Sequence, residues 1–113
     1  MSAKLQLSNI MDQLIRAIDG VFGAAVKEVI LFGSYARNEA ENDSDIDVMV
    51  LLDLPREQIP CHRWQIAEIA GSLLYEYGVV VSPVLESKSF FDRNRSLYPF
   101  FKNVDKEGVR YVA

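Results

Sequence analysis

Two aspartates at alternating positions are the side chains best placed to do chemistry. Asp45 and Asp47 open the apolar run DIDVMVLL, and on a β-strand such residues point to the same face with Cα atoms about 6.6 Å apart. Two carboxylates at that separation can bind a pair of Mg²⁺ ions about 3.5–4 Å apart, as in in-line phosphoryl transfer. Mg²⁺ prefers a few carboxylates together with phosphate oxygens and water. The pair therefore predicts a metal-dependent site for a phosphorylated substrate.

A second motif, Gly33-Ser34, is expected where a strand passes into a helical turn. Free backbone N–H groups at such a turn favour phosphate oxygens, and glycine lets a phosphate approach because it has no side chain. The Ser34 hydroxyl can donate one more hydrogen bond, and a role as a helix cap would be compatible with that contact. Arg37 lies between the two motifs and could neutralise a triphosphate, with a surface ion pair as the equal alternative.

Other interpretations of the acidic segment explain less. A solvated turn with helix-capping acids would account for Asp43, Asp45 and Asp47 but not for the Gly-Ser motif upstream. A calcium loop starting at Asp43 would need Gly at its sixth position and Glu at its twelfth. Those positions hold Val48 and Leu54, which excludes such a loop. Asp43 is therefore expected to be a loop residue and not a metal ligand.

Apolar periodicity predicts the elements that position these motifs. Apolar residues at helical spacing predict a helix over residues 5–19, with Gly20 as its stop. Strands are predicted at 26–33 and 45–52, and the second is expected to be covered on both faces because it is almost wholly apolar. The polar segment between them carries a predicted helical turn in SYARNEA.

The rest of the chain continues the alternation of helices and strands. A strand is predicted at 79–86, where Pro83 indicates an edge or a bulge. Short helical patterns broken at Pro99 follow, and GVRYVA is predicted as a last strand. Before that strand comes a helix closed by Gly78, whose apolar stripe comprises Trp64, Ala67, Ala70, Leu73, Leu74 and Tyr77. The order predicts an α/β (α+β) fold, a small mixed β-sheet with helices packed on it.

Length and composition restrict the function classes. The 113 residues are half apolar with a net charge of −4, which predicts a single globular domain over 1–113. Such a charge disfavours a basic nucleic-acid footprint, so nucleic acid is not an expected partner, but a nucleoside triphosphate needs only a local pocket. Cys61 is the only cysteine, which excludes an intramolecular disulfide. Without a secretion signal or a run of about 20 apolar residues, a cytoplasmic protein with no membrane partner is expected.

The two motifs, at their spacing, resemble those of a known family. Gly33-Ser34, ten residues and then Asp45-Ile46-Asp47 are similar to the signature of the DNA-polymerase-β-like nucleotidyltransferase superfamily. The segments GSYAR and SDIDVMV resemble its minimal nucleotidyltransferase (MNT) branch in particular. The likeness extends from about residue 10 to about residue 90 in order and spacing.

The resemblance implies a polymerase-β-like nucleotidyltransferase fold and a Mg²⁺-dependent transferase that moves AMP from ATP to a hydroxyl group. It implies that Asp45 and Asp47 are catalytic and hold the metal, and that Gly33, Ser34 and Arg37 bind the nucleotide. Many members of the branch pair with a helical HEPN-type protein. In such toxin–antitoxin pairs the nucleotidyltransferase is the antitoxin, and its partner protein would supply the hydroxyl.

Three features depart from the family pattern. Asn38 stands where a glycine often follows the arginine, and asparagine tolerates left-handed backbone angles. A third aspartate, expected on the strand after the long helix, is replaced by Ser82, and neither Glu86 nor Asp53 is expected to have the strand phase to substitute for it. No long acceptor-binding domain follows, so acceptor recognition is expected to come from another chain.

Two further functions stay open. The chain could be a non-catalytic antitoxin module that binds a nucleotide or a partner, which the loss of the third carboxylate favours. It could also modify a small molecule such as an aminoglycoside, with a homo-oligomer completing the acceptor site. The segment SFFDRNRSLYPFF is rich in aromatic residues and arginine, a composition favoured at interfaces. Its aromatics and Trp64 are expected in the core or at an interface with a partner or a second copy.

Overall fold

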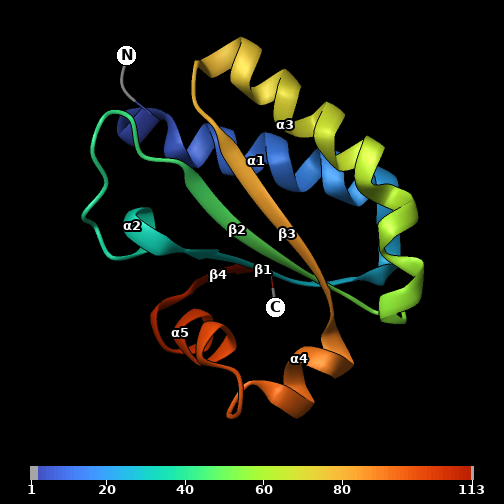
Figure 1. The fold of residues 1–113 in the computed structure, drawn as a ribbon. Helices are drawn as coiled ribbons and strands as arrows, with labels where there is room; N and C mark the ends of the chain where they lie inside the picture. The colour runs from blue at the N-terminus through green and yellow to red at the C-terminus, as the bar shows by residue number, and fades with distance from the viewer. Residues whose placement is uncertain (1–2, 113) are drawn as a thin grey trace.

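The computed structural model describes residues 3–112, which form a mixed sheet with helices on both faces (Figure 1). Its strands are β1 (Val26–Phe32), β2 (Ile46–Leu52), β3 (Val81–Ser87) and β4 (Val109–Val112). Its α-helices are α1 (Ala3–Phe22), α2 (Gly33–Ala36), α3 (Arg63–Tyr77), α4 (Lys88–Asn94) and α5 (Pro99–Glu107). The predicted order of elements and the mixed α/β architecture are confirmed.

The strands lie in the order β3-β2-β1-β4. β1 pairs antiparallel with both β2 and β4, and β2 pairs parallel with β3 through the crossover helix α3. In this register Asp47 lies between Phe32 of β1 and Ser82 of β3. β3 is an edge strand, as Pro83 indicated, because proline cannot donate to a second neighbour.

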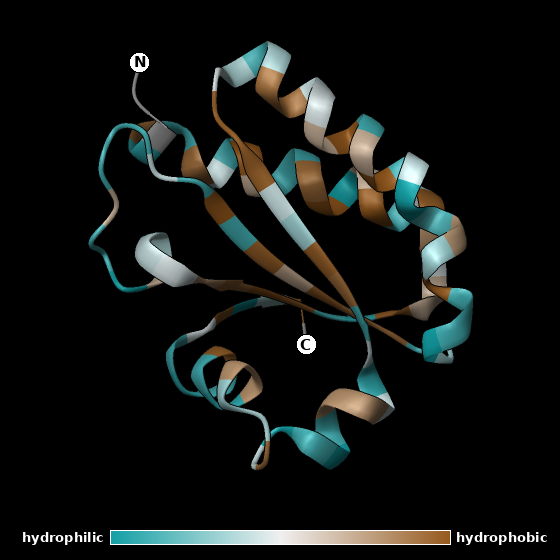
Figure 2. Ribbon diagram, viewed as in Figure 1, coloured by the Kyte–Doolittle hydropathy of each residue, from teal (hydrophilic) through white to brown (hydrophobic). Residues whose placement is uncertain are grey.

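Alternation along the strands creates two hydrophobic layers. On one face, Val48 and Val50 of β2 pack with α1 and α3; on the other, Met49 and Leu51 pack with α4 and α5. β2 is therefore buried on both faces, as predicted, and Figure 2 shows it largely hydrophobic beside the hydrophilic loop that follows α2. Asp47 shares the face of Met49, since residues two apart on a strand point the same way.

Two details of the predicted helices are wrong. α1 continues through Gly20 to Phe22, because Gly20 is exposed and a helix tolerates glycine there at a cost of about 1 kcal/mol. The chain turns instead at Gly23, where φ is +55°. In α3 the predicted stripe is right only in part: Leu73 is buried and Tyr77 packs against the core, but Trp64 is 82% exposed and the buried Ile66 lies outside the stripe. Apolar residues lie on several sides of α3, so periodicity identified its packed side incompletely.

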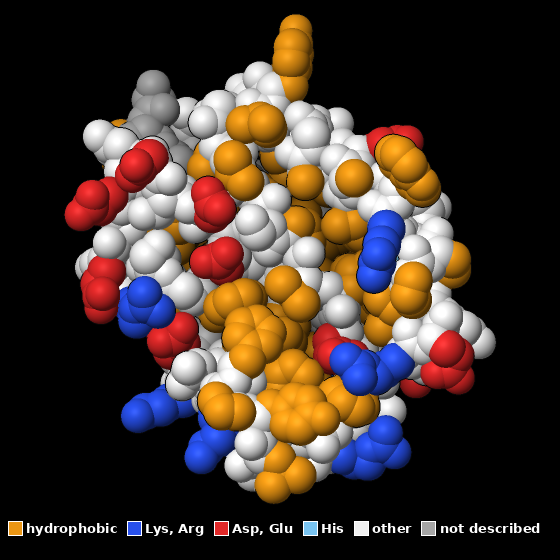
Figure 3. Space-filling model, viewed as in Figure 1, with side chains coloured by type: hydrophobic (Ala, Val, Ile, Leu, Met, Phe, Trp, Pro, Cys, Tyr) orange, Lys and Arg blue, Asp and Glu red, His pale blue; other side chains and the backbone are white. Residues whose placement is uncertain are grey.

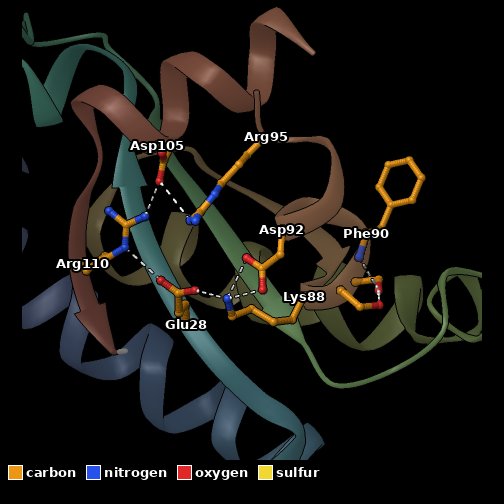
Figure 4. Close-up of polar contacts among 9 residues, drawn as sticks. Glu28, Lys88, Phe90, Asp92, Arg95, Asp105 and Arg110 are labelled. Atoms are coloured by element: carbon orange, nitrogen blue, oxygen red, sulfur yellow. Dashed lines mark hydrogen bonds and ion pairs between the residues drawn. The ribbon is translucent and has the colours of Figure 1, made fainter. Parts of the chain in front are cut away.

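A network of ion pairs connects α4, α5 and β4 to β1 (Figure 4). The buried carboxylate of Glu28 on β1 lies 3.0 Å from Lys88 Nζ of α4 and 2.8 Å from Arg110 Nε of β4. The same two cations also contact Asp92 and Asp105. The pKa of Lys88 is raised: burial opposes the charge, but the hydrogen bonds that Lys88 donates to Asp92 and Glu28 outweigh it. The network fixes the helical layer on the face of the sheet that carries Asp47.

Within residues 3–112, no helix combines the length and apolar character needed to cross a bilayer.

Candidate active site

The Gly-Ser and Asp-x-Asp motifs meet at one end of the β1–β2 pair. Phe32, the last residue of β1, pairs with Asp47, and the chain then enters α2 at Gly33. Gly33 has a φ of +74°, in the left-handed region that side chains disfavour. A Cβ atom on Gly33 would also collide with Asp47 Oδ2. Glycine is therefore required here twice over, and its backbone lies directly against one of the two predicted catalytic acids.

Asp47 is a partly desolvated carboxylate beside a like charge. It is the second residue of β2 and half-buried, whereas Asp45 lies just before the strand and is exposed. Burial raises the pKa of Asp47, the negative charge of Asp45 raises it further, and Arg37 opposes both effects. A cation between the two carboxylates would remove this electrostatic cost, so the local charge distribution suits a metal ion.

The donor set matches the chemistry of Mg²⁺ with a phosphorylated ligand. Asp45 and Asp47 offer hard oxygen ligands, which Mg²⁺ prefers. Among residues 3–112, no group of three or more His, Cys, Asp or Glu side chains is placed to hold a metal ion on its own. Phosphate oxygens and water would therefore have to complete the coordination, which is the usual mode for Mg²⁺ at nucleotide sites.

Ser34 and Asn38 occupy the turn that follows β1. Ser34 lies inside α2 and is half-buried; the N-cap residue is Phe32, without a side-chain cap bond, so the interpretation of Ser34 as a helix cap is wrong. Asn38 has a φ of +57°, the left-handed conformation that a glycine would adopt. The replacement of glycine by Asn38 thus preserves the backbone path, as the sequence predicted.

Arg37 binds carboxylates in the free protein. Its Nη1 atom lies 3.1 Å and 3.3 Å from the two carboxylate oxygens of Glu107, and its Nε atom lies 3.6 Å from Glu39. The side chain of Arg37 is 42% exposed, so these pairs are partly solvated. The ion pair that the sequence left open is present, while binding of phosphate by Arg37 stays a prediction.

Glu107 is a site residue that sequence reasoning missed. It ends α5, and its Oε1 atom accepts a hydrogen bond from the Gly33 N–H at 3.3 Å. Seventy-four positions separate the two residues, and no local motif connects them. The turn after Glu107 is tightly packed, because a Cβ atom on Gly108 would collide with Ile30 of β1 and with the Val104 carbonyl.

Ser82 stands where the resemblance to the family implies a third carboxylate. Ser82 is the direct β3 neighbour of Asp47. Glu86 shares the strand phase of Ser82, contrary to expectation, but it lies four residues further along β3. Its carboxylate accepts hydrogen bonds from Arg56 at 3.0 and 3.1 Å. Asp53 is exposed beyond the opposite end of β2, so neither acid replaces the missing one.

An aromatic surface begins beside Asp47. Phe32 contacts Phe100 edge to face at 5.5 Å between ring centroids, and Tyr98 lies 5.8 Å from Phe90. Figure 3 shows apolar side chains gathered over this region with acidic side chains to one side. As predicted for the aromatic segment, part of it is core, since Phe91 and Phe101 are buried, while Tyr98 and Phe100 are about half exposed.

With this geometry in view, the family can be assigned. The model of the nucleotidyltransferase domain family matches residues 11–112, which is nearly the whole chain. The protein is a member of the nucleotidyltransferase domain family. The match contains both motifs, the strand that carries Ser82, and Glu107.

Individual relatives agree with the family. A candidate protein adenylyltransferase of Methanocaldococcus jannaschii is 30% identical over 96 residues, covering 85% of this chain and 88% of its own. A nucleotidyltransferase structure from Sulfolobus solfataricus aligns with a TM-score of 0.67 at 17% identity, over 96% of this chain and 82% of the other. The MNT antitoxin in a complex with the tri-AMPylated HEPN toxin of Shewanella oneidensis aligns with a TM-score of 0.52 at 22% identity, over 96% and 71%. The two structural matches show the shared fold.

Proposed function

We propose that this nucleotidyltransferase is a Mg²⁺-dependent protein adenylyltransferase that transfers AMP from ATP to a hydroxyl group of a partner protein. The observation that carries the proposal is the close approach of Gly33 and Asp47, because the backbone proposed to bind phosphate then adjoins a carboxylate proposed to bind the metal. The name of the Methanocaldococcus relative supports the choice of AMP and of a protein acceptor.

In the proposed reaction the acceptor oxygen attacks the α-phosphorus of ATP. The bond from that phosphorus to the oxygen that bridges to the β-phosphate breaks, and pyrophosphate leaves with the bonding electron pair. Mg²⁺, held by Asp45 and Asp47, would neutralise charge that develops on the phosphates. The Gly33 backbone, the Ser34 hydroxyl and Arg37 would hold the triphosphate in line, so that the protein contributes mainly positioning and electrostatic stabilisation.

The acceptor hydroxyl must lose its proton as the new bond forms. With Ser82 beside Asp47, β3 supplies no second carboxylate there to accept that proton. In the proposal the proton passes to water, because Asp45 and Asp47 hold the metal and are not free to accept it. This assignment predicts slow turnover.

The proposed partner is a HEPN-type helical toxin, with this chain as the antitoxin. The Shewanella complex supports this choice, since an MNT antitoxin of the same fold accompanies an AMP-modified HEPN toxin there. The aromatic surface next to Asp47 offers the partner an apolar contact area beside the site of transfer.

A second candidate function is a non-catalytic antitoxin that neutralises its partner by covering it. The observation in its favour is that the β3 neighbour of Asp47 is Ser82 and not the carboxylate that the family resemblance implies. In that case Asp45 and Asp47 would contribute little to neutralisation of the partner, which would depend on the aromatic surface.

Label transfer separates the two functions. The purified protein is incubated with Mg²⁺, ATP labelled in its α-phosphate and a purified HEPN-type protein as the acceptor. Asp47→Asn is compared with Asp53→Asn, which makes the same charge change at the opposite end of β2. Label that reaches the partner, is lost in Asp47→Asn and persists in Asp53→Asn supports transfer. Absence of label, with tight binding to the partner in both variants, supports the covering function.

A further inference from the structure

The Glu107 carboxylate binds two of the groups proposed to bind the triphosphate, the Gly33 N–H and the Arg37 side chain. It accepts a hydrogen bond from the Gly33 N–H at 3.3 Å and two from Arg37, at 3.1 and 3.3 Å. Carboxylate and phosphate oxygens are both anionic acceptors, and Arg guanidinium and backbone N–H groups bind either. In the free protein, a side chain of the chain itself therefore occupies positions that the nucleotide needs.

The position of Glu107 is not explained by the stability of its helix. It is the last residue of α5, where the negative end of the helix dipole disfavours a carboxylate. Gly108 packs against Ile30 and the Val104 carbonyl, which fixes the end of α5 beside β1 and hence beside Gly33. The Glu107 side chain is still 27% exposed and that of Arg37 is 42% exposed, so rotation of the Glu107 side chain can break the contact without unfolding α5.

We propose that Glu107 is an internal competitor of the nucleotide: its carboxylate occupies the triphosphate position in the free protein and must move away before ATP binds. The inference depends on the proposed nucleotide site and adds its regulation. A single Gly33 N–H cannot donate fully to two acceptors, and a carboxylate left in place would repel the phosphates. The apparent dissociation constant for ATP is then the intrinsic constant divided by the fraction of molecules in which Glu107 has moved away.

The test is the affinity for ATP in Mg²⁺, measured by calorimetry on the full chain. Glu107→Gln keeps the shape of the side chain but removes its charge, and Glu107→Ala removes the acceptor atoms as well. Glu39→Gln is the matched control, since Glu39 also pairs with Arg37 but Glu107 is the acid that contacts the Gly33 N–H. We expect ATP to bind about tenfold more tightly to both Glu107 variants, if about one molecule in ten is open in the wild type. The control should change by less than about twofold.

A second probe checks the contact itself. The amide resonance of Gly33 in the nucleotide-free protein should shift in Glu107→Gln and stay in place in Glu39→Gln. Inorganic tripolyphosphate, which lacks base and ribose, should show the same tightening as ATP, because the competition concerns only the phosphates.

The possible results distinguish a failure of this inference from a failure of the proposed function. Unchanged or weaker ATP binding in Glu107→Gln overturns the competitor role and leaves the transferase proposal standing. Equal tightening in Glu39→Gln also overturns it, because the effect would then be one of net charge. Tighter binding without AMP transfer to the partner supports the competitor role and refutes the transfer. Absence of ATP and tripolyphosphate binding in every variant overturns both.

Discussion

Replacing Gly33 by alanine tests the contact that joins the two motifs. The new Cβ atom would sit on a residue with a φ of +74° and would collide with Asp47 Oδ2. Gly78→Ala is a matched control: Gly78 has a φ of +69°, but nothing lies within 4 Å of its added Cβ atom. Both substitutions impose the same backbone strain, and only the one at Gly33 adds the collision.

The expected losses in the free energy of unfolding follow from the backbone strain and from the collision. Holding alanine in a left-handed conformation costs about 1–2 kcal/mol, offset in part by about 0.4–1 kcal/mol from the lower entropy of the unfolded chain. Gly78→Ala should therefore lower the free energy of unfolding by about 1 kcal/mol. The collision at Gly33 adds about 1–3 kcal/mol, as for other overpacked positions. Gly33→Ala should thus lose about 2–4 kcal/mol, or about 8–17 °C in Tm for a domain of this size.

Urea denaturation followed by circular dichroism measures these differences, with each substitution also made in an Asp47→Ala background. There the collision partner is absent, so Gly33→Ala should cost only as much as Gly78→Ala. The reasoning would be refuted by equal losses for Gly33→Ala and Gly78→Ala in the wild-type background. A loss at Gly33 that persists undiminished beside Asp47→Ala would refute it as well.

Other substitutions test the site and its support. Ser82→Asp should restore a carboxylate beside Asp47 and raise the rate of label transfer about tenfold or more, whereas Val84→Asp, one step along the same face of β3, should not. Glu28→Gln should lower the free energy of unfolding by about 2 kcal/mol in urea denaturation, because two cations lose their buried partner; an unchanged midpoint would contradict this. Tyr35→Phe should leave stability equal or raise it by about 1 kcal/mol in thermal unfolding, because the Tyr35 hydroxyl is buried and has no hydrogen-bond partner within residues 3–112.

The sequence predicted those elements whose signals are local. The β-branched apolar runs gave β1 and β2 within a residue or two, and Gly78 closes α3 with a φ of +69° as expected of a helix-ending glycine. The packed side of α3 was predicted only in part, because a helix with apolar residues on several sides carries no unique stripe. Gly20 was wrong as a stop because one exposed glycine costs too little to end a long helix.

Some residues of the candidate site could likewise be predicted from local sequence signals, and others could not. Gly33, Ser34, Asp45 and Asp47 could be named because their spacing lies within one short segment. Glu107 could not, since its position depends on how α5 packs on β1, which no local pattern records. The strand phase of Glu86 was misjudged, because residues four apart on one strand share a face wherever the strand begins; its distance along β3 is what separates Glu86 from Asp47.

The most direct test of the central claim, that the two acids and the Gly-Ser turn form one metal-dependent triphosphate site, is the dependence of ATP affinity on Mg²⁺. Calorimetry with and without Mg²⁺ compares the wild type with Asp47→Asn. Mg²⁺ should tighten ATP binding to the wild type by at least about tenfold and should have little effect in Asp47→Asn. Without Mg²⁺ the order should reverse, because Asp47 then repels the phosphates. An equal effect of Mg²⁺ on both proteins would contradict the account.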